Sequence, residues 1–282
     1  MYKILSKKEL NPTVTQMEIE APLVANKAKA GQFIILRVDE DGERIPLTVA
    51  ACNKKTGAVQ IIFQVVGATT EKLNHKKEGE YIQDFVGPLG KPTRTEGIKK
   101  VCIVGGGVGC AIALPVAQAF KDLGAEVTSI IGFRSKDLLI LEEEFKEASK
   151  ELVVMSDDGS YGRHGNVTVP LKEMLEAGKQ FDEIITIGPL IMMKFVTLTA
   201  KPFGVPVTVS MNPIMIDGTG MCGCCRLTLI KDDKRITKFA CVDGPDFNGY
   251  EVDFDESMSR GRMYFPFERK AHEETCNLFK QA

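Results

Sequence analysis

The sequence predicts an all-β part followed by an α/β part: an N-terminal antiparallel β-barrel, a central parallel-sheet domain and a small cysteine-rich segment. Three observations predict this. Residues 1–98 contain short apolar, β-branched runs separated by turn residues. Residues 99–205 alternate buried-strand runs with helical patterns. Of the eight cysteines, four lie between positions 222 and 241.

The composition excludes several classes of protein. The 282 residues carry 36 Lys and Arg against 38 Asp and Glu, a net charge of −2, so no basic surface for nucleic acid is expected. The start, MYKILSKKEL, lacks the apolar region of a secretory signal. The most apolar stretch, Ile184–Met193, is about half a membrane span. We therefore expect a cytoplasmic protein that does not cross a membrane.

The strands expected in the barrel follow the alternating runs. They cover residues 13–21, 31–38, 45–52 and 57–66. Strands at this spacing with few helical patterns are typical of a small antiparallel barrel.

The α/β part begins at Lys100. Strands are expected at 100–107, 126–133, 151–159 and 182–189, with helices at 108–124, 141–150 and 169–178 between them. Residues 206–247 hold too little apolar mass for a core of their own. The tail, 248–282, is polar with interspersed Met263, Tyr264, Phe265 and Phe267, which either pack on this chain or dock a partner subunit.

A glycine turn stands where the first parallel strand meets its helix. It consists of Gly105, Gly106, Gly107, Val108 and Gly109. Glycines there let a pyrophosphate approach the backbone, and the helix start offers unpaired N–H groups. The dinucleotide pattern is incomplete, because Cys110 takes the third glycine position and no acidic residue ends the second strand. The alternative is a turn that merely packs a helix on a strand.

A second turn, Gly188-Pro189-Leu190-Ile191-Met192-Met193, closes a later strand. Ligands of open α/β sheets lie beyond the carboxyl ends of the strands, so both turns are expected to face one pocket. The alternative for Met192 and Met193 is core packing.

The cysteine cluster has the spacing D-x4-C-x2-C-x15-C, from Asp217 through Cys222 and Cys225 to Cys241. The plant-type [2Fe–2S] loop is C-x4-C-x2-C with a distant fourth cysteine, and Asp217 stands in the first position. We predict a [2Fe–2S] cluster on these four residues. Three alternatives stay open: Cys224 in place of Asp217, a structural zinc site, and free buried cysteines.

These features, in this order, resemble the ferredoxin–NADP reductase superfamily over nearly the whole chain, and within it the electron-transfer subunits of dihydroorotate dehydrogenase B. The resemblance implies FAD in the barrel and NAD(H) at the glycine turns. The implied FAD residues are Arg44, Pro46, Leu47, Thr48, Phe63, Gly67, Thr69, Thr70, Gly87, Pro88, Leu89 and Gly90. The implied nucleotide residues are Gly105, Gly106, Gly107, Val108, Gly109, Asp158, Gly159, Gly188, Pro189 and Met192. The chain departs from the pattern at Ile112, where a proline is usual.

Asp217 separates this chain from the dihydroorotate branch, whose subunits carry four cysteines. An aspartate there resembles the small subunits of NADH-dependent reduced ferredoxin:NADP⁺ oxidoreductases, which bifurcate electrons and are sometimes described as sulfide dehydrogenase subunits. The resemblance implies a larger partner subunit with FAD and [4Fe–4S] clusters, which provides the NADP(H) and ferredoxin sites. Electrons then pass between NAD(H), FAD and the [2Fe–2S] cluster. No catalytic side chain is assigned, because the cofactors carry this chemistry.

Two further hypotheses compete with this one. The first is an electron-transfer subunit for dihydroorotate or sulfide oxidation, and the second is a zinc-containing nucleotide-binding regulator. The choice between NAD and NADP also stays open, because Arg134 and Ser135 follow the second strand, where basic residues hold a 2′-phosphate.

Overall fold

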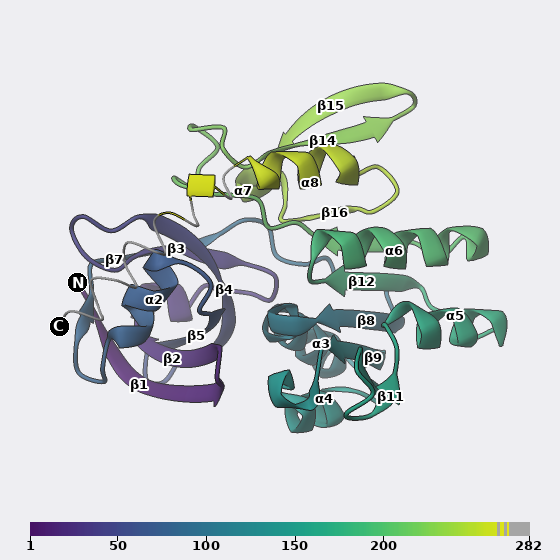
Figure 1. Ribbon diagram of the computed structural model, residues 1–282, viewed down its shortest axis with the longest axis horizontal. Helices are drawn as coiled ribbons and strands as arrows, with labels where there is room; N and C mark the ends of the chain where they lie inside the picture. The colour runs from purple at the N-terminus through teal and green to yellow at the C-terminus, as the bar shows by residue number, and fades with distance from the viewer. Residues whose placement is uncertain (264–265, 268–269, 271–282) are drawn as a thin grey trace.

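The structure is a computed structural model that describes residues 1–263, 266–267 and 270 (Figure 1). It contains two seven-stranded sheets and a two-stranded hairpin. The first sheet forms the barrel and the second the α/β domain, so the predicted fold class is confirmed. Within the described residues, no helix is long and apolar enough to cross a membrane.

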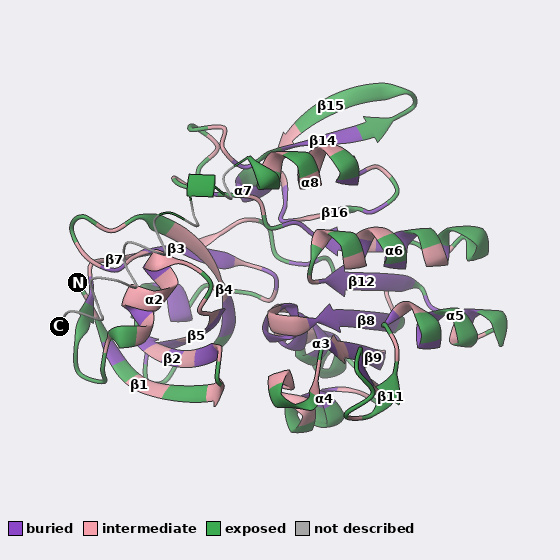
Figure 2. Cartoon of the chain, viewed as in Figure 1, coloured by how far each residue is buried: buried purple, intermediate pink, exposed green. Residues whose placement is uncertain are grey.

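The barrel is an antiparallel sheet of order β6-β1-β2-β5-β4-β3-β7. Its elements are β1 (Tyr2–Asn11), β2 (Val14–Glu20), α1 (Pro22–Ala25), β3 (Phe33–Arg37), β4 (Arg44–Asn53), β5 (Ala58–Gln64), α2 (Ala68–His75), β6 (Tyr81–Ile82) and β7 (Asp84–Leu89). The two edge strands, β6 and β7, are consecutive in the chain and separated only by Gln83, so the sheet curls into a nearly closed barrel. Its core is apolar and buried, as alternation along the strands requires (Figure 2).

The α/β domain has the sheet order β11-β10-β9-β8-β12-β13-β16. Its elements are β8 (Lys100–Gly106), η1 (Gly107–Gly109), α3 (Cys110–Asp122), β9 (Glu126–Phe133), η2 (Lys136–Leu138), α4 (Glu142–Ala148), β10 (Glu151–Ser156), β11 (Arg163–His164), α5 (Thr168–Glu176), β12 (Glu183–Ile187), α6 (Leu190–Ala200), η3 (Lys201–Phe203) and β13 (Val207–Ser210). All neighbouring strands are parallel except β16, which runs antiparallel to β13. The strand order reverses between β8 and β12, which is where ligands bind in sheets of this kind.

Helices cover both faces of this sheet. Helices α3 and α4 share one core with the barrel residues Val14, Ala50 and Ile62. Helices α5 and α6 share the other core with residues from the cysteine segment, among them Cys225, Leu227 and Cys241. The core on one face of the sheet therefore includes barrel residues, and the core on the other face includes residues of the cysteine segment.

The C-terminal part comprises β14 (Arg226–Lys231), β15 (Lys234–Phe239), α7 (Ala240–Asp243), β16 (Asp246–Asn248) and α8 (Phe254–Arg262). The hairpin of β14 and β15 projects at the top of Figure 1. Strands β13 and β16 both belong to the α/β sheet. The segment predicted to lie between 205 and 247 therefore begins and ends with strands of that sheet. Of the aromatic tail residues, Phe267 is exposed, and Tyr264 and Phe265 lie outside the described residues.

Candidate functional site

The two glycine turns meet at the carboxyl ends of β8 and β12. Ile187 pairs with Gly105 at the last rung between these strands. A Cβ on Gly109 would lie 2.5 Å from the Ile187 carbonyl oxygen, and one on Gly106 would lie 2.3 Å from Met192 Sδ. The two turns therefore pack against each other at one edge of the sheet, so closely that side chains at Gly106 and Gly109 are excluded. That they face one pocket stays a prediction.

Gly107 differs from its neighbours because it faces open space. Its φ is +55°, and a Cβ there would meet nothing within 4 Å. The backbone of the turn is thus accessible to a ligand while its flanks are packed. Within the described chain, no side chain caps the N-terminus of the 13-residue α3 that follows. Because the Cys110 N–H already bonds to the Gly107 carbonyl oxygen, a phosphate would meet the backbone of the glycine turn itself.

Cys110, at the position of the third motif glycine, is a core residue. It is fully buried, and its thiol lies 3.0 Å from the Cβ position of Gly105. Burial raises the pKa of this thiol, so it is held in its neutral form. A small, buried side chain therefore replaces glycine without opening the turn.

Arg134 and Asp158 lie side by side where β9 and β10 end. The backbone N–H of Asp158 donates to the Arg134 carbonyl oxygen at 3.2 Å. The Asp158 carboxylate accepts from the Ser160 hydroxyl at 2.6 Å and the Ser160 N–H at 2.9 Å, and these bonds lower its pKa. Both side chains are exposed at the same edge as the glycine turns, and Gly159 adjoins them. An exposed cation and an exposed anion therefore stand at the ends of these two adjacent strands.

On the barrel, the predicted FAD residues of β4 follow one another at the strand start. Pro46, Leu47 and Thr48 pair with Ile35, Ile34 and Phe33 of β3 and stay partly exposed. Arg44 is exposed, and its guanidinium lies 3.9 Å from the Asp84 carboxylate. Asp84 of β7, which no motif singled out, accepts a hydrogen bond from Arg37 Nε at 2.7 Å and is the nearest carboxylate to Arg44.

The turn before α2 is held by Thr70. Its hydroxyl accepts from the N–H groups of Val66 and Gly67, at 3.0 and 3.1 Å, and donates to the Gly67 carbonyl at 2.9 Å. Thr69 is nearly buried and contacts Glu43. Phe63 is 1% exposed and lies in the barrel core, so the structure places it away from the surface that the other predicted FAD residues share.

The Gly87-Pro88-Leu89-Gly90 segment ends β7 and leads to the linker toward the α/β domain. The Gln32 side chain donates to the Gly90 carbonyl at 2.7 Å, and Lys91 N–H donates to the Gly244 carbonyl at 2.7 Å. The end of this predicted flavin segment is therefore bonded directly to the chain that follows Cys241.

The four predicted ligands of the cysteine loop lie as two pairs, Asp217 beside Cys222 and Cys225 beside Cys241. Asp217 accepts from the N–H groups of Thr219 and Cys222 at 2.9 and 2.8 Å, which lowers its pKa to about 2 and keeps it ionised. Cys225 and Cys241 are buried with their Sγ atoms 3.2 Å apart. The Cys224 Sγ lies 4.0 Å from the Cys222 carbonyl oxygen. Burial and the neighbouring thiols of Cys222 and Cys225 raise the pKa of Cys224. Across the described residues, no three His, Cys, Asp or Glu side chains converge on one point.

This loop packs on the barrel. Gly218 has a φ of +72°, and a Cβ there would lie 2.6 Å from Leu89 and 3.1 Å from Ile35. The loop that carries Asp217 and Cys222 is therefore in van der Waals contact with the predicted flavin segment. Glycine at 218 is what permits this approach.

Comparisons with known proteins agree with this organisation. Residues 212–253 match the family model of the iron–sulfur cluster binding domain of dihydroorotate dehydrogenase B. The chain is 47% identical to a homolog of the dihydroorotate dehydrogenase B (NAD(+)) electron transfer subunit from Thermotoga maritima, covering 97% of this chain and 95% of that one. It is 30% identical to the corresponding subunit of Desulforamulus reducens, with 89% and 96% covered.

A solved structure of similar shape comes from work on flavin-based electron bifurcation in the NADH-dependent reduced ferredoxin-NADP oxidoreductase. It is 46% identical, has a TM-score of 0.89 and covers 97% of both chains. The similarity therefore extends through the barrel, the α/β domain and the cysteine loop.

Proposed function

Because the chain belongs to the family of dihydroorotate dehydrogenase B electron-transfer subunits, we propose that it is the flavin and iron–sulfur subunit of an oxidoreductase complex. It passes electrons between NAD(H), FAD and a [2Fe–2S] cluster. The observation that carries the proposal is the contact of the cysteine loop with Leu89 and Ile35 of the barrel. That contact brings the proposed cluster and flavin sites next to each other.

The residues present fit FAD. Arg44 offers a bidentate cation for a diphosphate, and the partly exposed face of Pro46, Leu47 and Thr48 offers backbone and apolar contacts for the flavin. The turn at Gly67 and the start of α2 lie in the same domain, and Gly87–Gly90 leads toward the cysteine loop. When bound, FAD supplies hydride acceptance on one side and single-electron transfer on the other. The chain's own residues bind and orient it.

The residues also fit a nicotinamide dinucleotide. The open backbone at Gly107 and the uncapped start of α3 suit its diphosphate. On the other side of the place where the strand order reverses, at the carboxyl end of β12, lie Gly188, Pro189 and Met192. We assign NAD(H) here on the similarity to NADH-dependent and NAD(+)-linked proteins, with Asp158 facing the ribose hydroxyls.

The two ligand pairs fit a binuclear cluster. Each iron of a [2Fe–2S] cluster takes two protein ligands, and the loop supplies Asp217 with Cys222 and Cys225 with Cys241. The ionised Asp217 carboxylate replaces a thiolate without changing the ligand charge. Cys224 is not assigned as a ligand.

Within this framework, we propose that the complex is an NADH-dependent ferredoxin:NADP⁺ oxidoreductase that bifurcates electrons. Asp217 in the first ligand position and the similarity to the solved oxidoreductase over 97% of the chain support this choice. A larger partner subunit with FAD and [4Fe–4S] clusters then provides the ferredoxin and NADP(H) sites. The second candidate is a dihydroorotate-type complex, which the names of the relatives favour.

Cofactor content tests the first part of the proposal. Protein purified without oxygen is expected to hold one FAD and the two irons of one cluster per chain, with flavin and iron–sulfur absorption in the visible spectrum. Zinc without flavin would contradict it. Co-purification then separates the two complexes, since a partner that contains [4Fe–4S] clusters supports the first and a flavin-containing partner without them the second.

A further inference from the structure

The chain that leaves the barrel and the chain that leaves the cysteine loop lie side by side. Gly90 ends the predicted flavin segment, and a Cβ there would lie 3.1 Å from Pro245 Cδ and 3.2 Å from the Gly244 carbonyl oxygen. The next residue, Lys91, donates its N–H to that same carbonyl at 2.7 Å. The end of the predicted flavin segment is therefore packed against the chain that follows Cys241, the last predicted cluster ligand.

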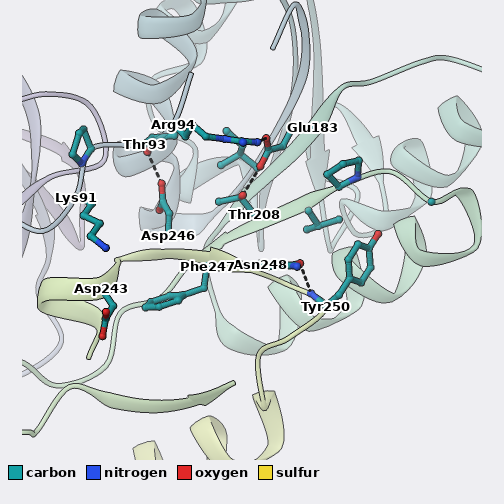
Figure 3. A pocket seen from close by; sticks show the side chains of 15 residues that line it. Lys91, Thr93, Arg94, Glu183, Thr208, Asp243, Asp246, Phe247, Asn248 and Tyr250 are labelled. Carbon is teal, nitrogen blue, oxygen red and sulfur yellow. Dashed lines mark hydrogen bonds and ion pairs between the residues drawn. The ribbon is translucent and has the colours of Figure 1, made fainter. Parts of the chain in front are cut away.

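Thr93 extends this contact to the barrel and to the α/β sheet. Its N–H donates to the Ala30 carbonyl oxygen at 3.0 Å, and its hydroxyl donates to Asp246 Oδ2 at 2.6 Å (Figure 3). A Cβ on Gly31 would lie 2.2 Å from Thr93 Oγ1, so the backbone of the barrel loop lies directly against this hydroxyl. Thr93 is buried, where a hydrogen bond is electrostatically stronger than in water. Thr93 therefore joins the barrel to strand β16, which begins at Asp246.

Asp246 is held through uncharged groups. Ser210 lies directly opposite on β13, and its hydroxyl faces the same carboxyl group. Glu183 is the charged residue that faces this carboxyl group, and it carries the same sign. Burial raises the pKa of Asp246, and Glu183 adds to the rise. Burying a carboxyl group among hydroxyls and a like charge costs free energy, so what Asp246 provides is a fixed position for Thr93 and not net stability.

The linker has little other support at this point. Residues 91–94 line a cavity of about 560 Å³, together with the starts of β12 and β13 and residues 243–250 (Figure 3). Where the linker borders this space, the described residues leave it unpacked. The Arg94 guanidinium lies 3.1 Å from Glu183, but the Arg94 side chain is 70% exposed, and exposed ion pairs contribute little. The Thr93–Asp246 hydrogen bond is therefore the main side-chain contact that fixes the linker to the sheet.

We propose that Thr93 and Asp246 are positioning residues that fix the distance between the FAD and the [2Fe–2S] cluster and thereby set the rate of electron transfer between them. The inference rests on the proposed function and adds two residues that lie outside both predicted ligand sets. One end of their hydrogen bond follows Gly87–Gly90 in the chain, and the other end follows Cys241. A shift at this bond moves the two predicted centres relative to each other and leaves the ligands of each centre in place.

Anaerobic stopped-flow reduction by NADH of two variants at position 93 tests the proposal. Thr93→Val has nearly the same shape but no hydroxyl, so Asp246 loses its bond to the linker. We expect reduction of the cluster to slow roughly ten- to hundredfold, because a displacement of about 1 Å costs a positioned reaction about that much. Thr93→Ser is the matched control, which keeps the hydroxyl and should keep the wild-type rate. Flavin reduction in the same trace should change less, because the proposed nucleotide site lies at the opposite end of β12.

Asp246→Ala and Asp246→Asn make the same comparison from the other side of the bond, and they decide it if Thr93→Val loses its cofactors. Asparagine keeps an oxygen that accepts from Thr93 and should keep the rate, whereas alanine should slow the cluster as Thr93→Val does. The double variant Thr93→Val/Asp246→Ala should be no slower than either single variant, because the same bond is lost in all three.

FAD and iron content verify that each variant is loaded, and the content of the wild type tests the proposed function separately. An unchanged cluster rate in loaded Thr93→Val or Asp246→Ala, equal slowing by Thr93→Ser, or additive slowing in the double variant would overturn the inference.

Discussion

The glycine-turn edge of the α/β domain and the cysteine loop both depend on glycine, but they are built in different ways. At the edge, β8, α3 and β12 fix the backbone first, and Gly106 and Gly109 fill spaces too narrow for any Cβ. In the loop, regular structure is replaced by hydrogen bonds to Asp217, a buried cysteine pair and the contact of Gly218 with the barrel. The first site is therefore expected to persist without its ligand, whereas the second depends on what it holds.

The largest expected effect falls on the loop. Cys241→Ala removes one member of the buried pair and is expected to abolish cluster binding, measured as loss of both irons and of the visible absorption. Cys224→Ala is the matched control and should keep the cluster. If Cys224→Ala lost it while Asp217→Ala kept it, Cys224 would be the ligand in place of Asp217.

Two alanine substitutions in the glycine turn, at Gly109 and at Gly107, are expected to differ in their effect on stability. Gly109→Ala places a Cβ 2.5 Å from a backbone oxygen and should lower the free energy of unfolding by about 3 kcal/mol. Gly107→Ala meets open space and is strained only by its φ of +55°, so about 1 kcal/mol is expected. Urea denaturation of both variants measures the difference. Equal losses would show that the turns do not interlock as described.

Arg44→Ala tests the proposed flavin site of the barrel, for comparison with the two glycine-dependent sites. Loss of a charged contact to the diphosphate should weaken FAD binding by roughly ten- to hundredfold, measured by equilibrium dialysis of the flavin. Arg163→Ala removes an exposed arginine whose partner, Glu173, lies elsewhere in the α/β domain, and should not change flavin affinity. Full flavin retention by Arg44→Ala would refute the assigned site.

The smallest effect concerns the strand starts of the α/β domain. Asp182 accepts from the N–H groups of Lys99 and Lys100 at 2.7 and 2.8 Å, and these bonds lower its pKa. A carboxylate whose pKa is lower in the folded protein than its ordinary value of 3.8 stabilises the fold at pH values above 3.8. That stabilisation is lost as the pH falls through the pKa of the folded state. Asp182→Asn should thus cost less than about 1 kcal/mol at pH 7, and the cost should shrink as the pH falls below 3.8. A cost independent of pH would show that the charge is not responsible.

The parts of the fold predicted from sequence are those with a strong period. The strand at 126–133 was predicted at its observed bounds, and the helix ended by Gly124 is α3. Strand β1 was not predicted, because its lysines hide the alternation, nor was α6, because its apolar residues on both faces resemble a strand. Strand β16 was not predicted either, because a three-residue strand is defined only by its pairing with β13.

The candidate site shows the same limit. Motifs located the glycine turns and the cysteine loop, because residue type and spacing set their chemistry. The burial of Phe63 depends on tertiary packing, which no local pattern encodes.

The most direct test of the central claim is an anaerobic stopped-flow titration of the purified protein with NADH. Flavin and iron–sulfur absorption are followed separately. We predict that the flavin bleaches first and that the cluster absorption then falls, because the cysteine loop contacts the flavin segment at Leu89. A flavin that is reduced while the cluster stays oxidised, or NADH that reduces neither, would contradict the account.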